Sequence, residues 1–274
     1  MEKINKDNKV FYSEYSDNII MKRFESPNQL RRYAHRQQYL VFLKYIKPGM
    51  KVLDAGCGEG ILAVMMAKMG AAVTACDISK PNIDVCIKYA AEEKVDNISF
   101  LLADSENLPF PDNSFDLVVS SHVLEHLPDF DKGLTEVMRV TKERAVVAIP
   151  TIMNLCSLVQ VGRGAFWYRG KRMLFALPFG FGRMLLALIF SREGVNEFYT
   201  GNKNLVHIFR FPWVMKKKIK KYRLKLVEYE ASTLCLPHFQ LLLVLIKFLD
   251  KYKNRKFFRN FGYGTTYVIE KNKS

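Results

Sequence analysis

The sequence lacks several features that mark secreted, membrane-spanning or metal-binding proteins. Its N-terminus, MEKINKDNKVFYSEY, has no apolar stretch of the kind that a signal peptide carries, so a cytoplasmic protein is expected. The five cysteines are odd in number and none has a partner at C-x-x-C spacing, which favours reduced thiols. No histidine, cysteine and aspartate residues cluster at metal-ligand spacing, so no metal ion is expected. Without these features the chain is typical of a globular protein, with 49% hydrophobic and 25% charged residues.

Charge is divided unequally between the two halves of the 274-residue chain. Residues 1–150 hold 19 Lys and Arg against 21 Asp and Glu, a net charge of −2. Residues 151–274 hold 23 Lys and Arg against 6 Asp and Glu, a net charge of +17. This asymmetry predicts that the second half meets an anionic partner. The alternative is a lysine-rich composition that serves only solubility.

Apolar residues recur in a pattern that alternates strands with helices in the first 150 residues. We expect strands over residues 51–54, 72–77, 98–102, 115–120 and 145–149. Helices are expected over residues 28–46, 61–69, 81–93 and 130–140. Strands separated by helices of about ten residues predict a parallel sheet with helices on both of its faces.

The regular pattern stops at Pro150 and resumes beyond residue 206. The residues between mix glycines, aromatics and basic side chains and exceed the length of a normal connection, so they predict an inserted cap. Helices over residues 211–222 and 239–253 and strands over residues 224–230 and 265–270 then complete the sheet. The expected organisation is an N-terminal helical segment (1–47), a core (48–150), the cap (151–206) and a C-terminal completion of the sheet (207–274).

A glycine-rich loop, VLDAGCGEG over residues 52–60, lies where the first strand of the core turns into a helix. Glycines let the backbone approach a ligand closely, and the helix N-terminus offers unpaired N–H groups. In this D-x-G-x-G-x-G pattern Asp54 precedes the first glycine and Glu59 lies inside the loop. Two carboxylates repel a pyrophosphate at short range but attract an ammonium group. The loop therefore favours S-adenosylmethionine over a dinucleotide.

Acidic residues also follow the next two strands. Asp77 ends the second strand, where a carboxylate can accept from both ribose hydroxyls of an adenosine cofactor. Asp104 follows the third strand, where it could accept from an adenine amino group. A single strand-end aspartate is more often a turn or cap residue. Three acids at successive strand ends instead predict a ligand site, because ligands of open α/β sheets bind along that edge.

Three segments together resemble a known family: VLDAGCGEG, VTACDIS and LLADSENLPFPDNSFDLVVSSHVLEHLPD. They are similar to the "type 11" class I S-adenosylmethionine-dependent methyltransferases, which are related to the methyltransferases of ubiquinone and menaquinone biosynthesis. The resemblance implies an α/β, Rossmann-like seven-stranded sheet of order 3-2-1-4-5-7-6, with strand 7 antiparallel and helices on both faces. It also implies that an N-terminal helix covers the cofactor. The cofactor-binding residues that it implies are Asp54, Ala55, Gly56, Cys57, Gly58, Asp77, Ile78, Asp104, Ser105 and Ser121.

Methyl transfer needs a base only when the acceptor loses a proton at or before the transfer. His122 follows the fourth strand, nearest to the expected methyl position, and His207 follows the cap, so these two are the candidate catalytic residues. The alternative for His122 is a wall of the cofactor pocket, and for His207 an anchor of the cap. Glu125 and His126 are further candidates, with ordering of the segment after the strand as the alternative.

The cap pairs aromatic with basic residues in the stretch FWYRGKR over residues 166–172. Two apolar runs follow, residues 173–190 and 241–246. The first is interrupted by Pro178, Gly180 and Gly182 and is a poor candidate for a membrane-spanning helix. Apolar runs flanked by Lys and Arg fit helices that lie on an anionic membrane, and a core beneath the cap is the alternative.

These features favour a methyltransferase that acts on a small or lipid-linked acceptor, such as a quinone precursor, a lipid or a lipid-carried sugar intermediate. Peripheral contact with an anionic membrane is the expected partner interaction. One alternative is an RNA methyltransferase that uses the basic half, although the sequence shows no RNA-binding module. A second alternative is a protein that binds S-adenosylmethionine without catalysis.

Overall fold

The structure is a computed structural model that describes residues 2–15, 19–162, 172–197, 205–234 and 240–272. Its α-helices are α1 (Glu2–Ser13), α2 (Ile19–Phe24), α3 (Gln29–Leu43), α4 (Ile61–Lys68), α5 (Lys80–Glu92), α6 (Phe130–Val140), α7 (Leu155–Val161), α8 (Arg172–Ile189), α9 (Pro212–Lys221) and α10 (Leu243–Leu249). Its strands are β1 (Lys51–Ala55), β2 (Ala72–Asp77), β3 (Ile98–Leu102), β4 (Phe115–Ser121), β5 (Thr141–Ile149), β6 (Gly194–Asn196), β7 (Ile208–Arg210), β8 (Leu224–Ala231) and β9 (Thr265–Lys271). Short 3₁₀ turns include η1 (Leu124–His126), η3 (Gln240–Leu242), η4 (Asp250–Tyr252) and η5 (Phe258–Asn260).

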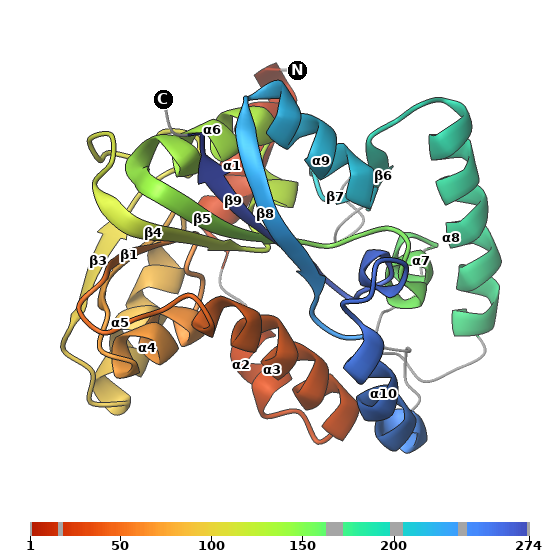
Figure 1. The fold of residues 1–274 in the computed structure, drawn as a ribbon, viewed down its shortest axis with the longest axis horizontal. Coiled ribbons are helices and arrows are strands. Elements are labelled where there is room, and N and C mark those ends of the chain that lie inside the picture. The colour runs from red at the N-terminus through yellow and green to blue at the C-terminus, as the bar shows by residue number, and fades with distance from the viewer. Residues whose placement is uncertain (1, 16–18, 163–171, 198–204, 235–239, 273–274) are drawn as a thin grey trace.

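Seven strands form one twisted sheet in the order β3-β2-β1-β4-β5-β9-β8 (Figure 1). The first five are parallel, and β9 runs antiparallel to both β5 and β8. Counted along this sheet, β8 and β9 are strands 6 and 7, so the expected order and the antiparallel seventh strand are confirmed. The carboxyl ends of β1, β2, β3 and β4 consequently meet along one edge.

Helices cover both faces of the sheet because each central strand is apolar on both sides. On one face, α3, α4 and α5 pack over alternate residues such as Val52, Val73 and Val119. On the other face, α6 and α9 pack over the intervening residues, which include Leu53 and Val118. Strands buried on both faces fix their register, since a shift of one residue would exchange the two cores.

The inserted segment has more regular structure than its sequence suggests. Helix α8 runs without interruption through Pro178, Gly180 and Gly182, although these residues interrupt the apolar run in the sequence. Glycine serves here to bring α7 and α8 together. A Cβ atom on Gly180 would lie 1.8 Å from the Leu158 carbonyl oxygen, and one on Gly162 would lie 1.8 Å from the Ala176 carbonyl oxygen. The two backbones are therefore in close contact, and the proline and glycines are accommodated within this helix pair.

The C-terminal apolar run is also shorter as a helix than expected. In place of one helix over residues 239–253, α10 is flanked by the turns η3 and η4. It packs through Ile246 against Leu30 and Ala34 of α3. Among the described residues no helix is long and apolar enough to cross a membrane. Of the aromatic–basic stretch of the cap, residues 166–171 lie outside the described residues.

Candidate cofactor and acceptor pocket

The glycine loop is held against the end of β2 by backbone hydrogen bonds. The N–H groups of Gly56 and Cys57 both donate to the Cys76 carbonyl oxygen at 2.8 Å. Gly56 has a φ of 82°, and a Cβ atom there would lie 2.3 Å from a methyl carbon of Val123. Only glycine combines this left-handed backbone with so close a neighbour. The loop therefore passes directly beneath the segment that follows β4.

Asp77 joins the loop to the start of α5. Its carboxylate accepts hydrogen bonds from the Gly58 N–H at 2.8 Å and from the Ser79 N–H at 2.9 Å. The Asn82 side-chain amide lies 3.5 Å from the same carboxylate. Burial raises the pKa of Asp77, and these hydrogen bonds offset part of that effect. Asp77 also lines the pocket, so its carboxylate can position the loop and face a ligand at once.

Asp54 lies behind the loop, where burial leaves its charge uncompensated. The residue is 1% exposed, and neither carboxylate oxygen has a hydrogen-bond partner. Burial, together with the nearby carboxylate of Asp77, raises the pKa of Asp54 to about 7. An unpaired buried carboxylate is a favourable neighbour for a cationic ligand. Asp54 does not itself line the pocket, so its charge would affect a ligand across the glycine loop rather than by direct contact.

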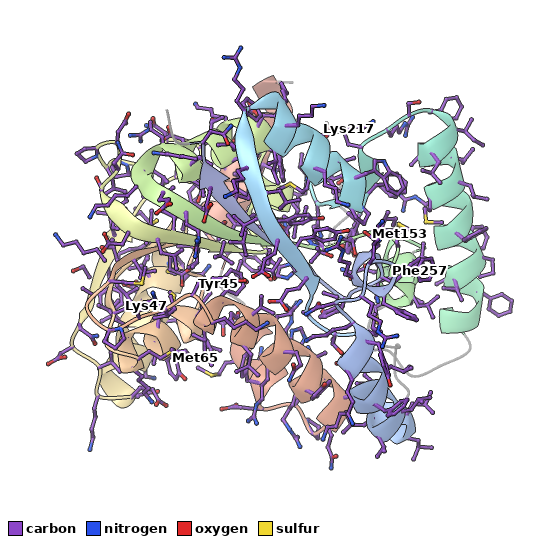
Figure 2. The ribbon with its side chains drawn as sticks, in the orientation of Figure 1. Tyr45, Lys47, Met65, Met153, Lys217 and Phe257 are labelled. Carbon is purple, nitrogen blue, oxygen red and sulfur yellow. The ribbon has the colours of Figure 1, made fainter. Side chains whose placement is uncertain are left out.

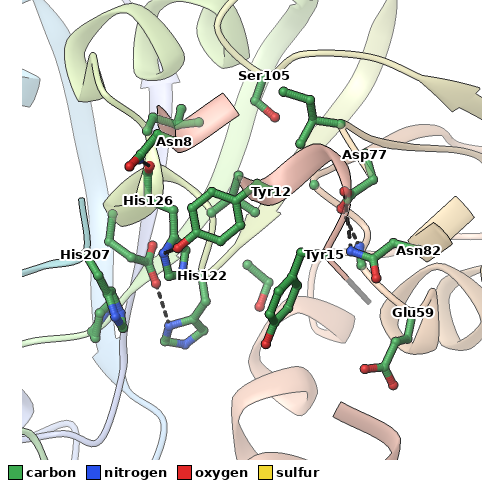
Figure 3. Close-up of a pocket in the computed structure, with 18 of the residues that line it drawn as sticks. Asn8, Tyr12, Tyr15, Glu59, Asp77, Asn82, Ser105, His122, His126 and His207 are labelled. Carbon is green, nitrogen blue, oxygen red and sulfur yellow. Dashed lines mark hydrogen bonds and ion pairs between the residues drawn. The ribbon is translucent and has the colours of Figure 1, made fainter. Parts of the chain in front are cut away.

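One pocket extends along the carboxyl edge of the sheet (Figure 3). Of the residues predicted to bind cofactor or to act in catalysis, those that line it are Gly56, Gly58, Asp77, Ile78, Asp104, Ser105, Ser121, His122 and His207. Three predicted residues, Asp54, Ala55 and Cys57, lie buried beneath the loop and do not line it. The roles of all these residues as ligand contacts stay predictions.

Helix α1 lies across the pocket and is held there by polar contacts. Lys9 Nζ lies 2.5 Å from Asp104 Oδ2 and 3.0 Å from Glu106 Oε2. Farther along the helix, the Tyr12 hydroxyl lies 2.7 Å from His126 Nδ1. Figure 3 shows the Tyr12 ring between the histidines and Asp77. Asp104 is thus already paired with a lysine, and an adenine amino group would have to share its carboxylate.

His122 is held in an unusual backbone conformation by a chain of side-chain contacts. Its φ is 58°, which is uncommon for a residue with a side chain and is often found at functional sites. His122 Nδ1 lies 3.2 Å from Glu125 Oε1, and His122 Nε2 lies 3.1 Å from Gln38 Nε2. Gln38 Oε1 in turn lies 3.1 Å from His35 Nδ1. One assignment satisfies the chain: His122 donates to Glu125 and accepts from Gln38.

Glu125 is 1% exposed and nevertheless ionised. Burial opposes its charge, but interactions with histidines, chiefly the hydrogen bond from His122, hold the pKa of Glu125 below its usual value. Burial and the neighbouring His207 lower the pKa of His126 to about 3, so that ring is neutral at physiological pH. A carboxylate thus orients His122, the arrangement that histidine bases commonly require.

The structure also brings together residues that the sequence keeps apart. Glu125, His126 and His207 present ligand atoms that all lie within 4.8 Å of one another. The spacing of these residues in the sequence does not reveal the cluster, because His207, next to β7, meets η1 only in the fold. Sequence reasoning also missed Asn8, Gln38 and Tyr263 as lining residues, and no motif in the sequence signals them.

Comparison with known proteins identifies the domain. A family described as "Methyltransferase domain" matches residues 53–149. Residues 53–149 are a class I methyltransferase domain. For this domain the expected family is therefore confirmed, together with S-adenosylmethionine as its cofactor.

Curated relatives of the methyltransferase domain act on several kinds of molecule, as their names state. A sterol 24-C-methyltransferase of Gibberella zeae is 37% identical over 121 residues, which are 43% of this chain and 32% of that protein. A demethylmenaquinone methyltransferase of Corynebacterium efficiens is 42% identical over 97 residues, which are 35% of this chain and 39% of that protein. The chain therefore spans less than half the length of these two relatives.

Solved structures share the fold of most of this chain, including residues outside the methyltransferase domain. Magnesium protoporphyrin IX methyltransferase from Synechocystis, solved with bound S-adenosylmethionine, has a TM-score of 0.58 at 14% identity, covering 97% of this chain and 98% of that one. A SAM-dependent methyltransferase from Aquifex aeolicus has a TM-score of 0.55 at 14% identity, covering 93% of this chain and 99% of that one. At such identities the likeness concerns the fold alone.

The raised pKa of Asp54 predicts how stability depends on pH when no ligand is bound. The folded state holds the Asp54 proton more tightly than the unfolded state, so stability is lost as pH rises from about 4 towards 7. Asp54→Asn cannot ionise and should raise the free energy of unfolding at pH 8 by up to about 4 kcal/mol, as three pKa units imply. The difference should shrink as pH falls. Urea unfolding at pH 8 and pH 5 measures it.

A matched control separates this effect from a general change of charge. Asp96 is exposed, and Asp96→Asn should change stability little at either pH. If Asp54→Asn instead destabilised the protein equally at both pH values, the Asp54 carboxylate would have bonding partners and the account of its burial would be wrong.

Proposed function

We propose that the whole protein is an S-adenosylmethionine-dependent methyltransferase whose acceptor is a small or lipid-linked molecule. The observation that carries this proposal is the continuity of the pocket, which joins the glycine loop to the histidines (Figure 3). Gly58 and Asp77 lie on the side expected to hold the cofactor, and His122 and His207 lie on the other. A cofactor bound on the first side would hold its methyl group close to an acceptor bound on the second. Holding two reactants in this orientation contributes much of the rate enhancement of a displacement reaction.

His122 is the proposed base for an acceptor that must lose a proton. Its ring is 27% exposed and lines the pocket, while Glu125 lies behind it and is 1% exposed. A buried carboxylate on Nδ1 favours the tautomer that leaves the Nε2 lone pair available, and Gln38 occupies that lone pair until an acceptor replaces it. His207 stays a second candidate, although its contact with Glu197 favours a role in positioning.

An assay with lipid extracts tests the proposed activity and the role of His122 together. Extract from cells that lack the gene, incubated with protein and S-adenosylmethionine, should yield S-adenosylhomocysteine and a compound heavier by one methylene group. His122→Asn should lower kcat by about 10²-fold or more, because general-base catalysis contributes on that order. The affinity for S-adenosylmethionine should hardly change. Mass spectrometry and a binding titration measure the two effects.

Two results would contradict this account in different ways. Unchanged kcat with weakened cofactor binding in His122→Asn would make His122 a wall of the pocket. Cofactor binding without any methylated product, from lipid extracts or from soluble metabolites, would favour a protein that binds S-adenosylmethionine without catalysis.

The acceptor class is proposed from the end of the molecule opposite β3, where α8 and α10 lie (Figure 1). Both helices and the turn η3 before α10 leave large apolar side chains in solvent: Phe179 is 70% exposed, Ile189 72%, Leu241 98% and Val244 80%. Apolar exposure on this scale usually marks an interaction surface. Lys247, Lys251 and Lys256 accompany α10 and are exposed. We define the exposed residues Leu241, Val244, Leu245 and Phe248 as the α10 patch.

An anionic membrane fits this end of the protein better than nucleic acid does. The basic run of α9 is partly neutralised: Lys218 Nζ lies 2.6 Å from Asp131 Oδ1, and Lys221 Nζ lies 2.8 Å from Asp131 Oδ2. Lys217, labelled on α9 in Figure 2, and Lys220 are exposed. Nucleic acid would not require the apolar patch, whereas a membrane uses apolar insertion and positive charge together. A membrane-bound acceptor also suits relatives named for sterol and quinone methylation.

Cosedimentation with vesicles tests the membrane proposal. The protein should bind vesicles of phosphatidylglycerol and phosphatidylcholine, and part of the binding should persist at high salt, since salt does not screen apolar contacts. Val244→Ser with Phe248→Ser should abolish the part that resists salt. Ile87→Ser on α5, an exposed apolar residue (44% exposed) at the other end of the molecule, is the matched control and should bind as the wild type does.

The same titrations distinguish the alternative partner. Binding to RNA should fall steeply with salt and should not respond to changes in the α10 patch. If the protein stayed in the supernatant with anionic vesicles and held RNA at physiological salt, the membrane proposal would be wrong and the RNA alternative would replace it.

A further inference from the structure

We propose that Glu125, His126 and His207 form a site for a divalent transition-metal ion on the acceptor side of the pocket. Their candidate ligand atoms all lie within 4.8 Å of one another. The rings of His126 and His207 lie side by side, with centroids 4.3 Å apart and planes inclined by 30°. Three side chains converging from η1 and from the residue before β7 can therefore enclose a single ion after small side-chain adjustments.

The ligand set is chemically suited to such an ion. Two imidazoles and one carboxylate bind zinc in many hydrolytic enzymes and iron(II) in many oxygenases, with other positions left open. Glu125 Oε1 faces His122, whereas Glu125 Oε2 is buried without a hydrogen-bond partner. A buried carboxylate oxygen without a partner is costly, and coordination of a cation would satisfy it.

A carboxylate lies beside the His207 imidazole, as in many metal sites. His207 Nδ1 lies 2.8 Å from Glu197 Oε2, and the Gln160 amide donates to the same oxygen at 2.7 Å. A carboxylate beside the nitrogen that faces away from the ion is a common feature of carboxylate–histidine–metal sites. That contact assigns Nε2 of His207 to the ion. Tyr12, whose hydroxyl lies 2.7 Å from His126 Nδ1, would move or add its oxygen when an ion binds.

The local charge also favours a cation. Glu125 and Glu197 together bring two carboxylates to the cluster. The positive charge of Arg210 partly offsets these carboxylates. Its guanidinium, however, lies over the Phe130 ring, 3.9 Å from the ring centre, and its Nε lies 3.5 Å from Glu193 Oε2. The two carboxylates of the cluster match the charge of a divalent ion. Such neutrality lowers the cost of burying the ion among protein side chains.

The position of the site suggests what an ion would do. Glu125, His126 and His207 line the same pocket as Gly58 and Asp77. An open coordination position would face that pocket, where an acceptor hydroxyl could bind and lose its proton more readily. This part of the inference rests on the proposed function, whereas the metal site itself does not.

Metal binding can be measured without cofactor or acceptor. Protein freed of metal by chelation would be titrated with Zn²⁺ by calorimetry, and with Co²⁺ by visible spectroscopy. One ion should bind per chain, with a Co²⁺ spectrum of nitrogen and oxygen ligands. Glu125→Gln and His207→Gln should each weaken Zn²⁺ binding by at least about 10-fold, the usual lower limit even for removing a residue that only supports a ligand.

One control matches Glu125→Gln in chemistry. Glu143→Gln removes an exposed glutamate and should bind Zn²⁺ as the wild type does. Circular dichroism of each variant without metal checks folding. Should His207→Gln fail to fold, the near-isosteric Glu125→Gln and the wild-type Co²⁺ spectrum still decide the question.

Several outcomes would overturn the proposal. The wild-type protein could bind no Zn²⁺ at micromolar concentration, or folded Glu125→Gln could bind it unchanged. A sulfur-to-cobalt charge-transfer band would assign the ion to cysteines instead. None of these results depends on methyl transfer, so failure of the metal site and failure of the proposed function are distinguishable.

Discussion

The carboxylate of Asp77 accepts hydrogen bonds from the backbone of the glycine loop and from the first turn of the segment that leads into α5. It thereby fixes the loop against the end of β2, and the loop in turn lies directly beneath Val123. The segment after β4, which includes His122 and η1, is positioned on top of that contact. Both ends of the pocket therefore depend on one buried carboxylate and on the parallel pairing that brings the ends of β1, β2 and β4 together.

Helix α1 closes the pocket by polar contacts more than by apolar packing. Lys9 reaches Asp104 after β3, and Tyr12 reaches His126 in η1. The Ser79 hydroxyl donates to the Tyr15 carbonyl oxygen at 2.7 Å, which ties the end of this segment to α5. Segments held mainly by such contacts open at low free-energy cost, and elements that cover ligand sites are commonly of this kind. The contacts made by α1 are with the groups that a cofactor would approach, so entry of the cofactor and movement of α1 are expected to be linked.

The sequence was sufficient to predict the sheet and the loop because both depend on local pattern. Apolar strands of four to six residues, the D-x-G-x-G-x-G loop and acids at strand ends each occupy one short segment, and the order of the sheet followed from the family resemblance. The acceptor side could not be predicted in the same way. His207 meets His126 only because β7 returns from the inserted segment, and Gln38 meets His122 only because α3 packs over the sheet.

The helical structure of the inserted segment could not be read from the sequence for a related reason. Pro178 and Gly180 interrupt the apolar run, whereas in the fold α8 continues through them and Gly180 lies against the Leu158 backbone of α7. Tertiary contact overrides local propensity at such positions.

The central claim is that the edge of the sheet formed by the glycine loop, Asp54 and Asp77 selects a cofactor with a cationic methionine part over a pyrophosphate. Calorimetric titration of the purified protein with S-adenosylmethionine and, separately, with NAD tests this claim most directly. The account predicts saturable binding of one S-adenosylmethionine per chain and no measurable binding of NAD under the same conditions. Binding of NAD with comparable affinity, or no binding of S-adenosylmethionine by the folded protein, would contradict it.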